Sequence, residues 1–348
     1  MSLRILKVAI VGLVALIFAV FEIQRATMQT KQVETAGEKF KNIKVLNEMP
    51  ADQMGKVMSM MSASLGVECG YCHINADFAS DENKKKEEAR EMLRMTFEIN
   101  KQFFKGRPEI SCNSCHNGAE HPASASPLLP PVAHSPRPAQ PDPKPSGEEI
   151  VANYRKMLGA PKGTRYIKAQ RLEPNGAVEP EEIWVSGNKM RIETKYGDTT
   201  VIDGFDGTNP WKATNKGAIA LHSTEAQMIR DEASFYNGEF LNSYTKFEYR
   251  FTGDVEGKPA NLVIATTADG TRNRLYFDAK TGLLLRYVMS TPTVIGAHVV
   301  QVDLRDYKKA GGGLVPMTLK FAMPNVYWTR KILSVKDGIL IDDGKFVK

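Results

Sequence analysis

The sequence predicts a multidomain chain: an apolar N-terminal segment, a small all-α domain, a proline-rich linker and a C-terminal, mainly antiparallel β domain with a helix. Three observations lead to this fold class. Apolar residues recur at helical spacing in the first third, nine of the 29 residues from 119 to 147 are proline, and short strand-like runs fill the rest. With 348 residues, 42% of them hydrophobic, the chain can build two folded domains.

Residues 1–30 are expected to associate with a membrane. Arg4 and Lys7 precede fourteen uncharged, mostly apolar residues from 8 to 21. This length lies between the core of a signal peptide and a spanning helix, and no small-residue cleavage site follows. We therefore expect an uncleaved transmembrane anchor, with a cleaved signal as the alternative. Both interpretations place the remainder of the chain across the membrane.

Residues 31–118 are expected to form the all-α domain. The first long helix should begin near Pro50, which suits a first helical turn, and end at Gly66, a typical C-terminal cap. Its apolar positions share one helical face: Met54, Val57, Met58, Met61 and Leu65.

A second helix is expected from Asp81 to Phe104, capped by Ser80 at its start and closed by Gly106 and Pro108. Its predicted buried stripe is Ala89, Met92, Met95 or Thr96, Ile99 and Phe103.

The composition then changes twice. Residues 119–147 should be an extended, semi-rigid linker, because proline favours extended backbone. Residues 148–348 contain many strand-like runs separated by glycine-containing turns, which predicts the antiparallel β domain. The expected strands include 165–171, 190–196, 246–251, 262–267 and 283–289, and helices are expected at 148–158 and 223–236.

All four cysteines lie in two Cys-x-x-Cys-His motifs, Cys69 to His73 and Cys112 to His116. This is the signature for covalent attachment of c-type haem. The two thiols add to the haem vinyl groups, and the adjacent histidine binds the iron. Cys69, Cys72 and His73 are therefore predicted to hold one haem c, and Cys112, Cys115 and His116 a second.

Other uses of these cysteines are weaker interpretations. A thioredoxin-like redox pair does not require the following histidine. A four-cysteine zinc site usually has 12 to 20 residues between its pairs, whereas 39 residues separate Cys72 from Cys112. Two disulfides are possible in an oxidising compartment.

The sixth iron ligand is left open by the motifs. The other histidines are His121, beside the second motif, His134, in the linker, and His222 and His298, which we expect to lie far away in the β domain. Methionine is the better candidate because its soft thioether stabilises Fe(II). The best placed methionine before the first motif is Met58, which shares its helical face with Met54 and Met61. Before the second motif the candidates are Met92 and Met95. Each of these side chains could instead simply fill the hydrophobic core. Met60 points away from that face.

Residues 41–118 resemble the cytochrome c subunit of photosynthetic reaction centres. The resemblance lies in Lys44–Asn47, Val57–Met61, the first motif, Ala89–Thr96, Ile99-Asn100 and Ser111–Gly118. In that family a helix before each motif supplies a methionine to the iron, which implies Met58 for the first haem and Met92 for the second. The family usually carries four haems, whereas this chain has two motifs, so the resemblance implies a two-haem version without implying docking to a reaction centre.

The C-terminal part is weakly similar to the LolA-like, lipoprotein-sorting half-barrel. The similarity lies in Asp203–Gly207, Tyr276–Gly282 and Asp306–Lys309, which are mostly turn residues. It implies a half-barrel-like sheet that could hold an apolar ligand or a protein partner.

We therefore expect a non-enzymatic carrier of electrons between a redox donor and a redox acceptor. It should lie on the periplasmic side of the bacterial cytoplasmic membrane, held by its N-terminal helix. Nucleic-acid binding has little support, because residues 31–118 balance 13 basic against 13 acidic side chains. Two alternatives remain: a dihaem peroxidase or nitrogen-oxide reductase with one open iron, and an envelope binding or sorting protein with redox-sensing haems.

Overall fold

The computed structural model describes residues 33–74, 77–122, 140–158, 163–221, 223–310 and 313–348. The chain divides into two compact units, residues 1–51 and 52–348. The predicted N-terminal anchor lies outside the described residues. Among the helices that are described, none is long and apolar enough to cross a membrane.

The described part of the first unit is a short folded segment around α2 (Ala36–Lys39). Thr35 caps this helix in a box with Glu38, whose carboxylate accepts a 2.8 Å hydrogen bond from the Thr35 N–H. The Ala36 N–H donates to the carbonyl of Met49 at 2.7 Å, so the chain folds back on itself. Ala36 and Met49 are buried in its small core.

The second unit begins with helices, which we call the helical region (residues 52–118). Its elements are α3 (Met54–Leu65), the 3-10 turn η2 (Cys69–Tyr71), α4 (Lys85–Phe104) and α5 (Cys112–His116). A 3-10 turn, η1 (Ala51–Gln53), stands immediately before α3. Helix α3 ends where Gly66 adopts the left-handed conformation, as the sequence predicts.

Two expectations for the second long helix were wrong. The helix begins at Lys85, because the residues before it form a turn in which Ser80 Oγ accepts from the Glu82 N–H at 3.2 Å. The expected buried stripe is also displaced: Met92, Met95 and Phe103 are 43, 45 and 73% exposed. The buried residues of the helix are Arg90, Leu93, Thr96 and Asn100, of which only Thr96 belongs to the expected stripe. Arg90 and Asn100 can be buried because both have hydrogen-bonding partners, which hydropathy does not reveal.

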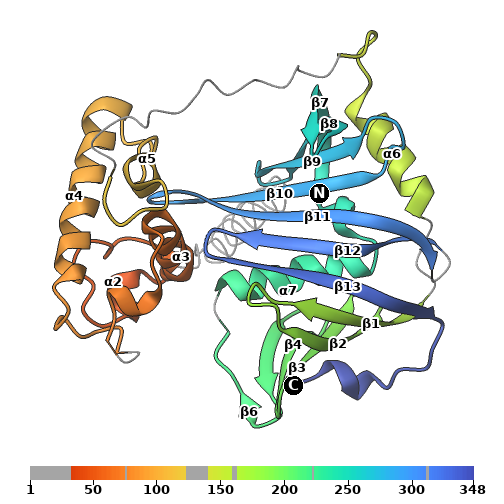
Figure 1. Cartoon of the computed structure of the whole chain (residues 1–348), viewed down its shortest axis with the longest axis horizontal. Helices are drawn as coiled ribbons and strands as arrows, with labels where there is room; N and C mark the ends of the chain where they lie inside the picture. Colours follow the sequence, from red (N-terminus) through yellow and green to blue (C-terminus); the bar gives the residue numbers. More distant parts are fainter. Residues whose placement is uncertain (1–32, 75–76, 123–139, 159–162, 222, 311–312) are drawn as a thin grey trace, which may run out of the picture. The chain divides into compact units, whose positions relative to one another are not determined.

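Residues 147–348 of the second unit, which begin with helix α6, are the sheet region. Within the described residues, thirteen antiparallel strands form one sheet in the order β6-β5-β4-β3-β2-β1-β13-β12-β11-β10-β9-β8-β7 (Figure 1). The pairing of β1 with β13 joins the first and last strands at the centre. The strands are β1 (Thr164–Leu172), β2 (Val178–Ser186), β3 (Lys189–Tyr196), β4 (Thr199–Phe205), β5 (Pro210–Thr214), β6 (Gly217–Ala218), β7 (Tyr244–Val255), β8 (Lys258–Thr267), β9 (Arg272–Asp278), β10 (Leu284–Thr293), β11 (Gly296–Ala310), β12 (Gly313–Met323) and β13 (Val326–Asp337).

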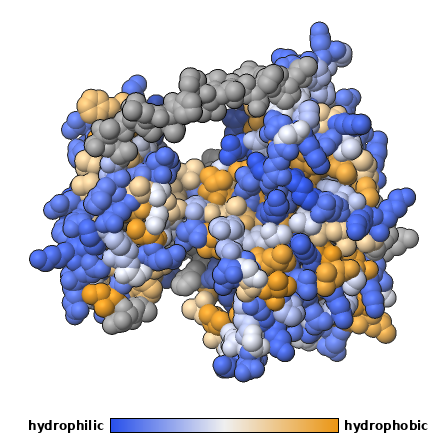
Figure 2. Space-filling view, viewed as in Figure 1, coloured by the Kyte–Doolittle hydropathy of each residue, from blue (hydrophilic) through white to orange (hydrophobic). Residues whose placement is uncertain are grey.

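Two helices share the core of this sheet. Helices α6 (Gly147–Leu158) and α7 (Ser223–Tyr236) contribute Tyr154 and Ile229 to one buried cluster with strand residues such as Ile183 and Phe277. Short 3-10 turns follow α7 and the last strand, at η3 (Phe240–Ser243) and η4 (Asp343–Phe346). Hydrophilic residues cover most of the face drawn in Figure 2. The structure confirms a helical N-terminal part followed by a large antiparallel sheet with helices.

A buried ionic cluster ties α7 to the sheet. Arg330, 2% exposed, donates two hydrogen bonds to Glu181 at 2.5 and 3.0 Å and one to the Tyr236 hydroxyl at 2.9 Å. Its guanidinium also pairs with Glu232. Although burial acts to raise the pKa of Glu181, Arg330 holds it below its ordinary value.

Candidate haem sites

The first Cys-x-x-Cys-His motif forms one tight turn. The backbone N–H groups of Cys72 and His73 both donate to the carbonyl oxygen of Cys69, at 3.3 and 3.0 Å. A 3-10 turn has about three residues per turn, so side chains three apart leave from the same side. Cys69 is exposed and Cys72 is half-buried. The two thiols can therefore meet a single flat group at the surface.

The histidine of this motif has a ring nitrogen without a partner. The buried Nδ1 atom of His73 makes no hydrogen bond to any of the described residues. The ring packs edge-on against Phe78, with 5.0 Å between the ring centroids. Burial, and then the charge of Lys86, lowers the pKa of His73. Its imidazole is therefore neutral near pH 7, which is the form that binds a metal ion.

The second motif is a short helix with an oriented histidine. Helix α5 carries all five motif residues and ends at Asn117, which adopts a positive φ of 46°. The Nδ1 atom of His116 lies 3.0 Å from the carbonyl oxygen of Ala119. Because a carbonyl only accepts, Nδ1 carries the proton of the neutral ring and Nε2 keeps a lone pair. Metal-binding histidines are commonly oriented in this way.

The end of α3 is packed tightly against the residues that follow the second motif. The Gly118 N–H donates to the carbonyl oxygen of Ser64 at 2.8 Å. A Cβ atom on Gly66, whose φ is +68°, would lie 2.3 Å from the Gly118 oxygen. Glycine is therefore required at position 66 both by conformation and by space. The helix that carries Met58 is thereby tied to the second motif.

Asn100 holds the approach to the second motif. Its amide Nδ2 donates to the Ile110 carbonyl at 2.7 Å, and its Oδ1 accepts from the Ile110 N–H at 2.9 Å. Asn100 is 5% exposed, and it fixes the backbone two residues before Cys112. Our interpretation of the residues assigned it no role, although a polar residue among the apolar positions of a helix is a signal that could have found it.

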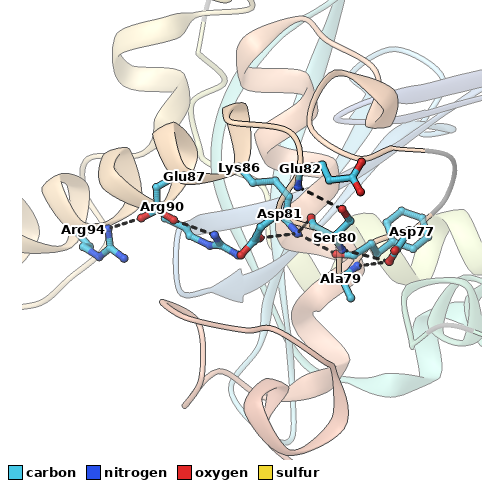
Figure 3. A network of polar contacts seen from close by, with 10 residues as sticks. Asp77, Ala79, Ser80, Asp81, Glu82, Lys86, Glu87, Arg90 and Arg94 are labelled. Carbon is cyan, nitrogen blue, oxygen red and sulfur yellow. Dashed lines mark hydrogen bonds and ion pairs between the residues drawn. The ribbon is translucent and has the colours of Figure 1, made fainter.

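An ionic network fixes the loop between the first motif and α4 (Figure 3). Asp77 Oδ1 accepts from the backbone of Ala79 and Ser80, at 3.0 and 3.2 Å. Asp81 pairs with Arg90 at 2.8 Å and with Lys86 at 3.2 Å. The buried charge of Arg90 is thereby compensated. This loop connects His73 to the helix that carries Met92.

The two predicted methionines occupy different environments. Met58 is half-buried on α3, whereas Met92 on α4 is exposed together with Met95 and Phe103. Met60, two residues after Met58, faces the sheet region, where its Sδ lies 3.7 Å from Thr293 Oγ1. Met92, Met95 and Phe103 thus leave an apolar strip along α4 that a flat apolar group would cover.

Two of the four cysteines, Cys72 and Cys112, lack the lowered pKa that is typical of reactive thiols. Burial raises the pKa of the Cys72 and Cys112 thiols, whereas redox-active cysteines have lowered values. All four cysteines are unpaired by disulfides. Among the described residues, no three His, Cys, Asp or Glu side chains gather in a way that could hold a metal ion.

The other histidines behave differently from one another. The His121 side chain is 82% exposed, and His134 and His222 lie outside the described residues. The expectation that His298 is remote from the helical region was wrong. It is 2% exposed on β11, and burial, followed by the charge of Lys56 on α3, lowers its pKa to about 4. Antiparallel pairing brings the β10–β11 hairpin back to α3, which spacing along the chain does not show.

The sheet region has a cavity of about 510 Å³. Its walls are mostly apolar and come from α6, α7, η3, β1 and β12. Tyr154, Phe240 and Val315 are among the lining residues, with Arg155 and Lys156 beside them. Its mostly apolar walls are compatible with the apolar ligand that the sequence analysis expects for this region.

Comparison with known proteins supports the cytochrome resemblance. Residues 19–133 match the family described as photosynthetic reaction centre cytochrome C subunit. The chain is 39% identical over 84 residues to cytochrome c-554 of Chloroflexus aurantiacus, covering 22% of this chain and 20% of that protein. It is 29% identical over 100 residues to the photosynthetic reaction center cytochrome c subunit of Roseobacter denitrificans, covering 26% of this chain and 27% of that one.

The similar solved structures each cover a little more than half of this chain. A putative outer membrane lipoprotein-sorting protein domain from Vibrio parahaemolyticus covers 57% of this chain, and 95% of that domain is covered, with 10% identity and a TM-score of 0.41. A LolA superfamily protein from Nitrosomonas europaea covers 58% of this chain, and 98% of that protein is covered, with 9% identity and a TM-score of 0.38. These values describe a loose likeness in the arrangement of the chain and say nothing about a ligand.

Proposed function

We propose that this protein is a dihaem c-type cytochrome that transfers electrons outside the cytoplasm. The observation that carries the proposal is that both Cys-x-x-Cys-His motifs form compact turns within the stretch that matches the cytochrome family model. The two curated relatives match 84 and 100 residues of the chain, about a quarter of it or less, so the activity of the whole chain is inferred from its own residues.

The residues present fit covalent haem c. Cys69 and Cys72 would form the thioether bonds of the first site, and Cys112 and Cys115 those of the second. His116 has the better prepared imidazole, because its Nδ1 is held by the Ala119 carbonyl. When bound, haem supplies an iron that alternates between Fe(III) and Fe(II).

The proposed distal ligands are Met58 and Met92. Met58 is half-buried on a helix anchored at its end to the second motif. Met92 is 43% exposed in an apolar strip of α4 that an apolar macrocycle would bury. His/Met ligation raises the potential relative to two histidines and closes the iron to substrates. This favours electron transfer without catalysis.

Each haem iron would accept and release one electron at a time. A reduced donor loses one electron to the protein, and an oxidised acceptor later takes one electron from it. We place the protein on the periplasmic side of the bacterial cytoplasmic membrane, because c-type haem is attached there, with residues 1–30 as the proposed anchor.

The first test is a pyridine haemochrome assay combined with intact mass, on protein produced with haem-attachment machinery. Two covalent haems per chain are expected. The paired variants Cys69→Ala/Cys72→Ala and Cys112→Ala/Cys115→Ala should each lose one haem. Wild-type protein without covalent haem would overturn the proposal. The mass also shows whether residues 1–30 stay attached.

A dihaem enzyme is the first alternative. A peroxidase or nitrogen-oxide reductase needs one open iron, and the exposed Met92 makes the second site the place to test for one. Binding of peroxide or nitrite to the wild-type protein, seen as a spectral change, would favour this class. An unchanged spectrum supports the carrier.

A binding or sorting role of the sheet region is the second alternative. The cavity of about 510 Å³ beside Arg155 and Lys156 favours an apolar ligand there. Removing residues 148–348 and measuring the rate of electron transfer separates the roles. An unchanged rate would argue against a part for the sheet region in the redox step.

A further inference from the structure

The β10–β11 hairpin ends in a contact and not in solvent. Thr293 and Gly296 pair across its two-residue loop. Hairpin loops usually project into water, yet Ile295 in this loop is 1% exposed. Figure 1 shows the hairpin extending beyond the neighbouring strands to the helices α3 and α5. An apolar residue so completely covered at a loop tip is typical of an anchor in an interface.

At Gly296 the loop is flanked by atoms of the helical region. A Cβ atom built on Gly296 would lie 3.4 Å from Cε of Met60 and 3.7 Å from Cβ of Ser111. Met60 belongs to α3, and Ser111 directly precedes the second motif. The loop therefore lies against α3, which carries Met58, and beside the residue that precedes the second motif.

Thr293 shapes this loop. Its hydroxyl donates to the Gly296 carbonyl at 2.7 Å and accepts from the Ile295 N–H at 3.3 Å. The same oxygen is 3.7 Å from Sδ of Met60. A hydroxyl has one proton, and the bond to Gly296 is shorter, so the approach to Met60 is mainly packing.

Further contacts lie along the same side of α3. Ser59 Oγ donates to Oδ1 of Asn325, in the turn between β12 and β13, at 2.6 Å. Lys56 is 8% exposed, and its charge acts on the buried His298 of β11. Positions 56, 59 and 60 share one helical face, since residues three and four apart are neighbours.

Met58 points away from this face. A residue two positions along an α-helix is rotated by about 200°, so Met58 is directed away from both Lys56 and Met60. Helix α3 has only twelve residues and no side-chain cap at its start. A helix this short is marginal in water and depends on tertiary packing.

We propose that the β10–β11 hairpin is a positioning element for the first haem site. It holds α3 from the face opposite Met58 and so fixes where the Met58 thioether lies relative to the first motif. This inference rests on the proposed role of Met58. It makes the sheet region a determinant of the potential of the first haem, and any partner that displaces the hairpin changes that potential.

The test compares two lysine substitutions two residues apart in the full-length holoprotein. Ile295→Lys places a charge in the buried loop, whereas Ala297→Lys adds the same charge at an exposed position on the same hairpin. The readouts are the weak near-infrared Met–Fe(III) band, the two midpoint potentials and hydrogen exchange of the α3 amides.

We expect Ile295→Lys to weaken the band of one haem, lower that potential and speed exchange in α3. Ala297→Lys and the conservative Ile295→Val should leave all three readouts as in the wild type. If Ile295→Lys fails to mature, Ile295→Ala is measured, with a smaller change in the same direction expected.

Unchanged bands, potentials and α3 exchange in Ile295→Lys and Ile295→Ala would overturn the hairpin proposal. Met58→Ala separates this from a failure of the ligand assignment. If Met58→Ala abolishes the band of one haem while Ile295→Lys and Ile295→Ala change nothing, Met58 is the ligand and the hairpin does not position it. If Met58→Ala leaves both bands intact, the ligand assignment itself is wrong.

Discussion

The side-chain amide of Asn100 makes two hydrogen bonds with the backbone of Ile110, at 2.7 and 2.9 Å. One residue of α4 thereby holds the backbone of the segment that leads into the second motif. The Asn100 side chain is 5% exposed, so its amide is buried where it makes these bonds. The local order of the second site thus depends on an amide that is not itself a ligand.

Replacing this amide should destabilise the helical region. Asn100→Ala leaves the N–H and C=O of Ile110 unpaired, which costs about 1–3 kcal/mol for each buried group left unsatisfied. Chemical denaturation of the holoprotein, followed at the haem absorbance, measures the loss. Asn100→Asp keeps the acceptor for the Ile110 N–H but turns a second oxygen toward the Ile110 carbonyl, so it should not recover the stability. Gln102→Ala, at an exposed position of the same helix, is the control. Equal stabilities of all three would contradict this role of Asn100.

The distal methionine of the second haem can be tested with a matched pair. Met92 and Met95 lie on the same helix and are 43 and 45% exposed. Met92→Ala should convert one haem to high spin, lower its potential and open it to carbon monoxide, because the iron loses its thioether. Met95→Ala should change none of these. A near-infrared Met–Fe(III) band that survives in Met92→Ala and disappears in Met95→Ala would reverse the assignment.

Substitution of Gly66 should destabilise the protein more than substitution of Gly106, a glycine with a similar backbone conformation. Gly66 and Gly106 have φ values of +68° and +75°, but only Gly66 has the Gly118 oxygen within 2.3 Å of a built Cβ. Gly106→Ala should cost about 1–2 kcal/mol from the left-handed conformation alone. Gly66→Ala should cost more and reduce attachment of the second haem. Thermal unfolding and haem content of the two variants provide the comparison, and similar losses in both would rule out the steric requirement.

The stability of the hairpin contact should depend on pH through His298. Its pKa in the folded protein, about 4, lies below the ordinary value, because of burial and the nearby charge of Lys56 on α3. Between pH 6.5 and 4 the unfolded chain binds the proton more readily, so this contribution is complete above about pH 6.5 and is lost as the pH falls toward 4. It amounts to at most about 3 kcal/mol.

The variant His298→Leu removes that titration. Its free energy of unfolding should therefore fall less steeply between pH 6.5 and 4 than that of the wild type. Denaturation at a series of pH values provides the measurement, and His121→Leu, at an exposed histidine, is the control. Parallel pH profiles for wild type and His298→Leu would show that the buried ring does not titrate in this window.

Arg330 should be the most sensitive charged residue of the sheet region. Arg330→Met leaves Glu181 and Glu232 without their buried counter-charge, and breaking a buried pair costs about 3–5 kcal/mol. Adding Glu181→Met should recover part of the loss, because one unpaired charge is then removed. Urea unfolding followed by tryptophan fluorescence measures both variants. A loss in Arg330→Met below about 1 kcal/mol, typical of surface pairs, would contradict the assignment.

Local signals predicted most of the secondary structure. Gly66 ends α3 as expected, although the helix begins at Met54, after a 3-10 turn that follows Pro50. The expected strand 190–196 lies within β3. The helix expected at 223–236 is α7. The start of α4 was misplaced because Asp81 is engaged by Arg90 nine residues later, a pairing that depends on the loop's path. The buried side of α4 was misplaced for a similar reason, since burial of Asn100 depends on Ile110.

The sequence by itself determined the covalent chemistry that this protein can support. Two cysteines three residues apart and an adjacent histidine are neighbours along the chain, so a single turn brings them together whatever the rest of the fold does. Tertiary structure alone decided what surrounds them. Ser111 lies close to Gly296, and the charge of Lys56 reaches His298, although the residues of each pair are far apart in sequence. The tip of the β10–β11 hairpin packs against α3, which brings them together. Such contacts arise from the packing of whole elements, and no short-range pattern encodes them.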